Sequence, residues 1–99
     1  MQMITLTNPS HPGEVLDELF LQPLEMSAGA LAKRLGVPRT RIERIVKAET
    51  SLTADTALRL STFFGNTAEF WMNLQRAYEL SEARAHVDLS DIQPLQAVA

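Results

Sequence analysis

The sequence predicts a small all-α protein, and three observations support this fold class. Apolar residues recur at helical spacing, helix-ending glycines or prolines separate the segments that contain them, and no stretch alternates as a strand would. Ninety-nine residues are enough for one modest core. We therefore expect one five-helix domain over residues 11–84, with an N-terminal lead at 1–10 and a short C-terminal tail at 85–99.

The composition excludes several classes of protein. The chain has no cysteine, which rules out a disulfide framework, a cysteine-ligated zinc site and a thiol nucleophile. No apolar run approaches the roughly 18 residues of a membrane span. Residues 1–9 lack the basic flank and long apolar stretch of a secretion signal. We expect a soluble cytoplasmic protein that does not contact a membrane.

The charge of the chain is distributed unevenly. The net charge is −3, yet residues 27–47 hold six Lys and Arg against one Glu, and residues 1–26 hold four acidic residues and no basic one. Local charge, rather than the total, governs attraction to a phosphate backbone. The concentration of basic residues in one segment favours a nucleic-acid partner over the alternative of ordinary surface charge.

Cap and stop residues set the expected helix ends. The first helix should run from Pro12 to about Leu21 and end at Pro23, with an apolar stripe made by Val15, Leu16, Leu19 and Phe20. A second helix should follow Ser27 as N-cap and end at Leu35.

The remaining helices follow from the same signals. The third should open with Pro38 and run to about Lys47. The fourth should begin after Thr53 and close at Gly65. Asn66, with Glu69 three residues later, resembles a capping box that opens a fifth helix to about Arg84. The apolar stripe of this last helix is expected at Phe70, Trp71, Leu74, Ala77 and Tyr78.

The second and third helices have the spacing of a helix-turn-helix over about residues 27–47. Ala32 is small where the two helices approach, and Gly36 permits the positive φ of the turn. Ile42 and Ile45, three residues apart, should fix the third helix to the core.

With those isoleucines inward, the exposed side of the third helix suits a DNA major groove. Arg bonds bidentately to guanine, and Thr offers a hydroxyl or methyl contact, so we expect Arg39, Thr40 and Arg44 to contact base edges. Arg41 and Lys47 are expected to contact phosphates. The alternative is a basic helix that binds an acidic protein.

Four segments together resemble the ordered signature of the HigA family of antitoxins, which belongs to the Xre group of helix-turn-helix regulators. They are His11-Pro12-Gly13-Glu14-Val15-Leu16, Leu31-Ala32-Lys33-Arg34-Leu35-Gly36-Val37, Leu52-Thr53-Ala54-Asp55-Thr56-Ala57-Leu58-Arg59-Leu60 and Phe70-Trp71-Met72-Asn73-Leu74-Gln75. The resemblance covers about residues 11–84. It implies a lambda-repressor-like five-helix domain that dimerises, binds an inverted repeat in its own promoter, and neutralises a co-encoded RelE-like mRNA endonuclease.

No active site is expected. His11 and His86 lie far apart and have no partner at metal-ligand spacing, so we predict no metal or cofactor and interpret His11 as a local cap. The serines and threonines have no associated base and are interpreted as caps. The alternatives to an antitoxin are a stand-alone regulator, an interaction module that does not bind DNA and, least favoured, an enzyme.

A homodimer is expected, because one recognition helix reads only a few base pairs whereas a two-fold dimer presents two. Trp71 and Tyr78 exceed what so small a core needs. They therefore favour the fifth helix and the tail as the dimer interface.

Overall fold

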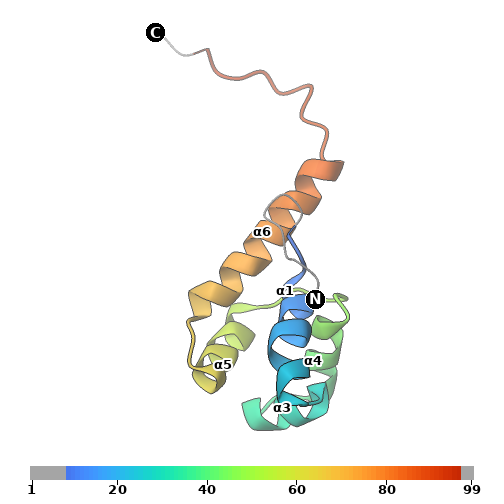
Figure 1. Ribbon diagram of the computed structural model, residues 1–99. Helices are drawn as coiled ribbons and strands as arrows, with labels where there is room; N and C mark the ends of the chain where they lie inside the picture. Colours follow the sequence, from blue (N-terminus) through green and yellow to red (C-terminus); the bar gives the residue numbers. More distant parts are fainter. Residues whose placement is uncertain (1–8, 97–99) are drawn as a thin grey trace.

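The computed structural model describes residues 9–96, which form five helical segments and no strand. The first segment is continuous and comprises α1 (Pro12–Val15), η1 (Leu16–Leu21) and α2 (Gln22–Leu24). It is followed by α3 (Ala28–Leu35), α4 (Arg39–Val46), α5 (Ala54–Phe64) and α6 (Ala68–His86). Figure 1 shows α1, α3 and α4 gathered at one end, with α5 beside them and α6 running away from this body. The predicted all-α, five-helix fold is confirmed.

The first helix extends further than the sequence indicated. It was expected to end near Leu21 because of Pro23, but it continues to Leu24 and ends at Glu25, whose φ is 50°. The cause is η1, a π-helical turn in which the Gln22 amide donates to the Asp17 carbonyl five residues earlier. A proline inside an α-helix clashes with the carbonyl four residues back, and a wider turn relieves that clash.

The same π-turn changes which residues face the core. Leu19, expected in the buried stripe, is 47% exposed, whereas Leu21 is 2% exposed. The wider turn brings Leu21 into line with Leu16 in place of Leu19, while Phe20 stays partly buried against Phe64 and Trp71. A regular 3.6-residue period was therefore the wrong template for this segment.

The core joins residues from all five helical segments. Trp71, the largest fully buried side chain, has no exposed surface and packs against Phe20 and Phe64. The expectation that Trp71 contributes to a dimer interface is therefore wrong, because this ring is buried within one chain. The other buried apolar residues of the cluster are Leu16, Leu21, Leu31, Ala32, Leu35, Ile42, Ile45, Leu52, Ala57 and Leu60.

Side-chain caps begin α3, α5 and α6, as the His11 side chain does for α1. Ser27 accepts a hydrogen bond from the Ala30 amide, as predicted, and Thr53 accepts one from the Thr56 amide. The cap of α6 is Thr67, which accepts from the Phe70 amide, and not Asn66. Pro38 is the N-cap of α4 rather than its first helical residue.

Asn66 bonds to a side chain and does not cap α6 as predicted. Its side-chain oxygen accepts a hydrogen bond of 2.9 Å from the Trp71 indole N–H. This bond satisfies the polar atom of a ring that is otherwise surrounded by apolar groups.

The chain leaves the body after α6. This helix ends at His86, slightly beyond the expected Arg84, and residues 87–96 are exposed throughout. Figure 1 shows this segment projecting away from the helices. Parts of the predicted N-terminal lead (1–8) and tail (97–99) lie outside the described residues. No helix in the described part of the chain is long and apolar enough to cross a membrane.

Candidate nucleic-acid interface

Helices α3 and α4 meet across a short turn at Gly36. Its φ is 72°, in the left-handed region that an L side chain rarely adopts. The next amide, of Val37, donates to the Ala32 carbonyl over 3.0 Å, which closes the turn. Ala32, Ile42 and Ile45 are all buried, so the four residues expected to form the structural part of the helix-turn-helix lie where the sequence placed them.

Burial of Ile42 and Ile45 determines which side of α4 remains available to a partner. The residues on its outer side and C-terminal end that were expected to contact DNA are all exposed: Arg39, Thr40, Arg41, Arg44 and Lys47. They lie on one helix of eight residues and on the residue that caps it. The structure thus brings the predicted site together on a single surface, which we call the α4 face.

The cations of the α4 face differ in their partners. Arg39 pairs with Glu43 one turn along the helix, with 3.3 Å between Nε and Oε2. Arg41 pairs with Asp55 of α5, with 2.9 Å between Nη1 and Oδ1. Within residues 9–96, Arg44 and Lys47 form no ion pair. These two residues therefore carry the charges most readily available to an anionic ligand.

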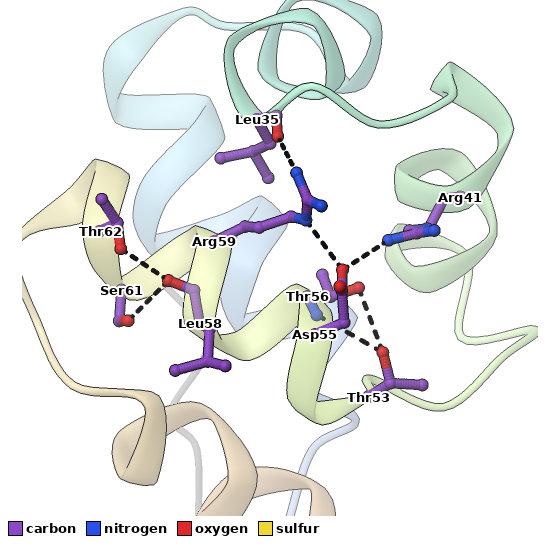
Figure 2. Close-up of polar contacts among 9 residues, drawn as sticks. All are labelled: Leu35, Arg41, Thr53, Asp55, Thr56, Leu58, Arg59, Ser61 and Thr62. Carbon is purple, nitrogen blue, oxygen red and sulfur yellow. Dashed lines mark hydrogen bonds and ion pairs between the residues drawn. The ribbon is translucent and has the colours of Figure 1, made fainter.

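The Asp55 carboxylate also pairs with a second arginine. Arg59, one turn along α5, donates from Nε to Asp55 Oδ1 over 2.8 Å. These hydrogen bonds, with the one from Arg59 foremost, hold the pKa of the Asp55 carboxyl below its usual value. Figure 2 shows Arg59 between Asp55 and the backbone of Leu35, while Arg41 approaches from the other side. Neither Asp55 nor Arg59 was among the site residues predicted from the sequence.

A shallow groove lies beside the α4 face. It has a volume of about 390 Å³ and runs between α4 and the start of α5. Its walls carry hydroxyl and guanidinium groups, which are hydrogen-bond donors suited to phosphate oxygens. The lining residues are Pro38, Thr40, Arg41, Arg44, Ile45, Thr50, Ser51, Thr53, Asp55 and Thr56.

The loop after α4 is held to the core by two buried polar side chains. The Gln75 side-chain oxygen accepts a hydrogen bond of 2.8 Å from the Leu52 amide, and its NH₂ donates to Glu79. Neither bond was predicted from the sequence. Because the loop continues directly from α4, its anchoring also fixes the end of the candidate DNA-reading helix.

His11 is the second anchor of this loop. Its Nδ1 accepts from the Gly13 amide over 2.9 Å, which confirms the predicted role as a cap. Burial lowers the pKa of His11 below its usual value, while a hydrogen bond with the Thr50 backbone and the charge of Glu14 oppose this shift. Among residues 9–96, no group of three or more histidine, aspartate or glutamate side chains is placed to hold a metal ion.

The packed pair of helices, its glycine turn and the cationic outer helix define a helix-turn-helix protein. The helix-turn-helix family model matches residues 18–71. Virulence-associated protein I of Dichelobacter nodosus is 52% identical over 73 residues, which are 74% of this chain and 68% of that protein. Antitoxin HigA-1 of Vibrio cholerae is 38% identical over 80 residues, which are 81% of this chain and 75% of that protein.

A solved structure extends the comparison to the whole fold. The Pseudomonas aeruginosa antitoxin HigA, solved with the higBA promoter, superposes with a TM-score of 0.83 at 39% identity. The superposition covers 89% of this chain and 99% of that one. The chain therefore belongs to the Xre-type helix-turn-helix family, among the relatives of HigA antitoxins.

Proposed function

We propose that this protein is a DNA-binding antitoxin that represses its own operon and neutralises a co-encoded RelE-like mRNA endonuclease. The observation that carries DNA binding is the α4 face, an exposed cationic surface on a helix that Ile42 and Ile45 fix to the core. The similarity of the whole chain to an antitoxin solved with promoter DNA supports DNA as the ligand of this face. The DNA-binding domain comprises residues 11–84, flanked by a lead at 1–10 and a tail at 85–99.

In this proposal, α4 enters the major groove of an operator. Arg39, Thr40 and Arg44 contact base edges, because arginine donates to guanine O6 and N7 in pairs and threonine offers both a hydroxyl and a methyl group. Arg41 and Lys47 contact phosphates at the sides of the groove. The Arg39–Glu43 pair is exposed and therefore weak, so it can open when a base takes the place of the carboxylate.

The proposed DNA-binding species is a homodimer on an inverted repeat. Two copies of α4 related by a two-fold axis would lie about 34–36 Å apart and read one face of the duplex. With Trp71 buried, the contact between copies is assigned to exposed apolar residues of α6 and the following segment. They include Leu80, Val87 and Leu89.

The segment after α6 is the proposed place for toxin binding. The protein acts in the cytoplasm and has no catalytic role of its own. The tail after α6 extends beyond the helical body and offers a surface separate from the α4 face, so the toxin and DNA can be bound by different residues.

The test combines DNA binding with toxin rescue. The purified chain is titrated against duplex DNA from upstream of its own gene and against a scrambled duplex, with dissociation constants of about 10⁻⁸–10⁻¹¹ M expected for the former. The neighbouring open reading frame is then expressed with and without this chain. Operator binding without toxin rescue would favour a stand-alone regulator. A chain that neither binds the operator nor rescues from the toxin would favour an interaction module.

A further inference from the structure

Two residues of α5 connect the two helices of the helix-turn-helix, α3 and α4. Arg59 Nη1 donates to the Leu35 carbonyl at the end of α3 over 2.9 Å, and its Nε donates to Asp55 Oδ1 over 2.8 Å. The same Oδ1 accepts from Arg41 Nη1 of α4 over 2.9 Å. Figure 2 shows this continuous chain, which we call the Arg59–Asp55–Arg41 brace. It links α3, α5 and α4 through three side chains and the Leu35 backbone carbonyl.

The backbone of α3 fixes Arg59, Arg59 fixes Asp55, and Asp55 in turn binds Arg41. The last carbonyls of a helix lack an intrahelical partner, so the Leu35 carbonyl is a fixed acceptor for Arg59. Asp55 and Arg59 are four residues apart on α5 and face each other across one turn. The carboxylate is therefore held in place before Arg41 reaches it. The pair with Arg41 then costs less conformational freedom in total, because the carboxylate is already ordered.

The brace also changes the charge that the α4 face presents. The sequence marks Arg41 as a phosphate contact, but its guanidinium already pairs with a carboxylate in the free protein. A phosphate that approaches Arg41 meets the negative charge of Asp55 at 2.9 Å from the guanidinium nitrogen. Arg44, one turn nearer the C-terminus, forms no such pair in the described part of the chain. The two arginines should therefore respond differently to the DNA backbone.

We propose that Asp55 is a specificity-determining positioning residue that acts through Arg41, an inference that rests on the proposed DNA binding. On any duplex, the Asp55 carboxylate repels the DNA phosphates. Because it is paired with Arg41, it also prevents that arginine from neutralising a phosphate and releasing a counterion. On the operator, α4 is seated in the groove, and the held guanidinium is directed to one phosphate. The carboxylate thus weakens non-specific binding more than operator binding and widens the difference between them.

The test is Asp55→Asn, measured on an operator duplex and a random duplex across a series of salt concentrations. Removing the carboxylate should strengthen binding to random DNA by about threefold to tenfold, with a salt slope steeper by about 0.9 for one added phosphate contact. Operator affinity should rise less, or fall, so that the ratio of operator to random affinity decreases. Asp55→Glu, which keeps the charge, should retain most of that ratio.

Two controls separate this role from a merely structural one. Glu69→Gln removes the same charge from the first turn of α6, where the described residues give it no arginine partner, and should leave the ratio unchanged. In an Arg41→Ala background, Asp55→Asn should no longer steepen the salt slope. An unchanged ratio in Asp55→Asn, or a slope that still steepens without Arg41, would overturn the role of Asp55 alone. A wild-type chain that binds neither duplex would overturn the DNA-binding proposal itself.

Discussion

The backbone of α1 at Gly13 lies directly against the Ile45 carbonyl at the end of α4. A Cβ built at position 13 would overlap that carbonyl oxygen. Glycine is therefore required here by the approach of two helices, since Gly13 is in a right-handed helix and has no need of a special φ. This contact sets how closely the candidate DNA-reading helix can pack on the rest of the protein.

Replacing Gly13 with alanine should force the first helix away from α4. Overpacking of a close contact costs about 1–3 kcal/mol, and more when the obstructing atom is backbone, as it is here. We expect a loss of about 3 kcal/mol in the free energy of unfolding, measured by urea denaturation. Gly65→Ala is the matched control: its φ is 76° with nothing within 4 Å of the added atom, so only strain of about 1–2 kcal/mol is expected. Equal losses in the two variants would contradict the importance of the contact.

Ala48 offers a change in the opposite direction. It ends the turn after α4 with a φ of 61°, although alanine disfavours the left-handed region. Ala48→Gly should raise the free energy of unfolding by about 0.5–1 kcal/mol, because the strain removed exceeds the flexibility gained by the unfolded chain. Ala30→Gly, at an exposed position in the first turn of α3, should instead lower it by up to about 1 kcal/mol. A destabilised Ala48→Gly protein would mean that this backbone is not strained.

Loss of the Gln75 anchor should loosen the loop after α4. Gln75→Met keeps the length of the side chain but leaves the buried Leu52 amide without an acceptor, which should cost about 1–3 kcal/mol. Hydrogen exchange at Leu52 should accelerate more than exchange in α5. Gln22→Met removes an exposed bond to Asp17 and should change the stability by less than about 0.5 kcal/mol. Unchanged exchange at Leu52 would exclude Gln75 as the anchor.

Stability should fall in mildly acidic solution because of His11. Its pKa is lowered in the folded protein from the ordinary 6.5, so the neutral form is favoured by folding. The resulting stabilisation is complete above pH 6.5 and is lost as the pH falls through the lower folded-state pKa. Protonation at Nδ1 would also abolish the bond accepted from Gly13.

Melting temperatures measured between about pH 5 and 8 test this assignment. His11→Asn can still accept from the Gly13 amide and should flatten the pH dependence across the range where His11 titrates. His86→Asn, at an exposed position, should leave that dependence as in the wild type. A wild-type pH profile in His11→Asn would assign the effect to another group.

The sequence was most informative where local chemistry determines structure. The Ser27 cap, the positive φ at Gly36 and the inward pair Ile42 and Ile45 each follow from one residue's own preference or spacing. The π-turn of the first helix did not follow, because it depends on how Pro23 is accommodated and not on a 3.6-residue period.

The contacts that organise the candidate site were also beyond sequence reasoning. Asp55 and Arg41 are 14 residues apart, and Gln75 meets Leu52 across 23 residues. Nothing in their spacing predicts that they meet, since such contacts depend on how whole helices pack. Sequence alone therefore located the cations of α4 but could not distinguish paired Arg41 from unpaired Arg44.

Arg44→Ala should separate DNA binding from stability and from toxin neutralisation. The side chain is exposed and unpaired within residues 9–96, so its removal should change the free energy of unfolding by less than about 0.5 kcal/mol. If Arg44 reads a guanine, operator binding should weaken by about 1–3 kcal/mol per half-site, and discrimination at one base pair should relax. If it contacts only phosphate, binding should weaken evenly on all sequences, with a salt slope smaller by about one unit. Arg84→Ala, which removes an exposed cation at the far end of α6, should bind the operator as the wild type does. Gel-shift titrations at several salt concentrations distinguish these outcomes. If Arg44→Ala and Arg39→Ala both bind the operator with wild-type affinity, the α4 face is excluded as the DNA-reading surface.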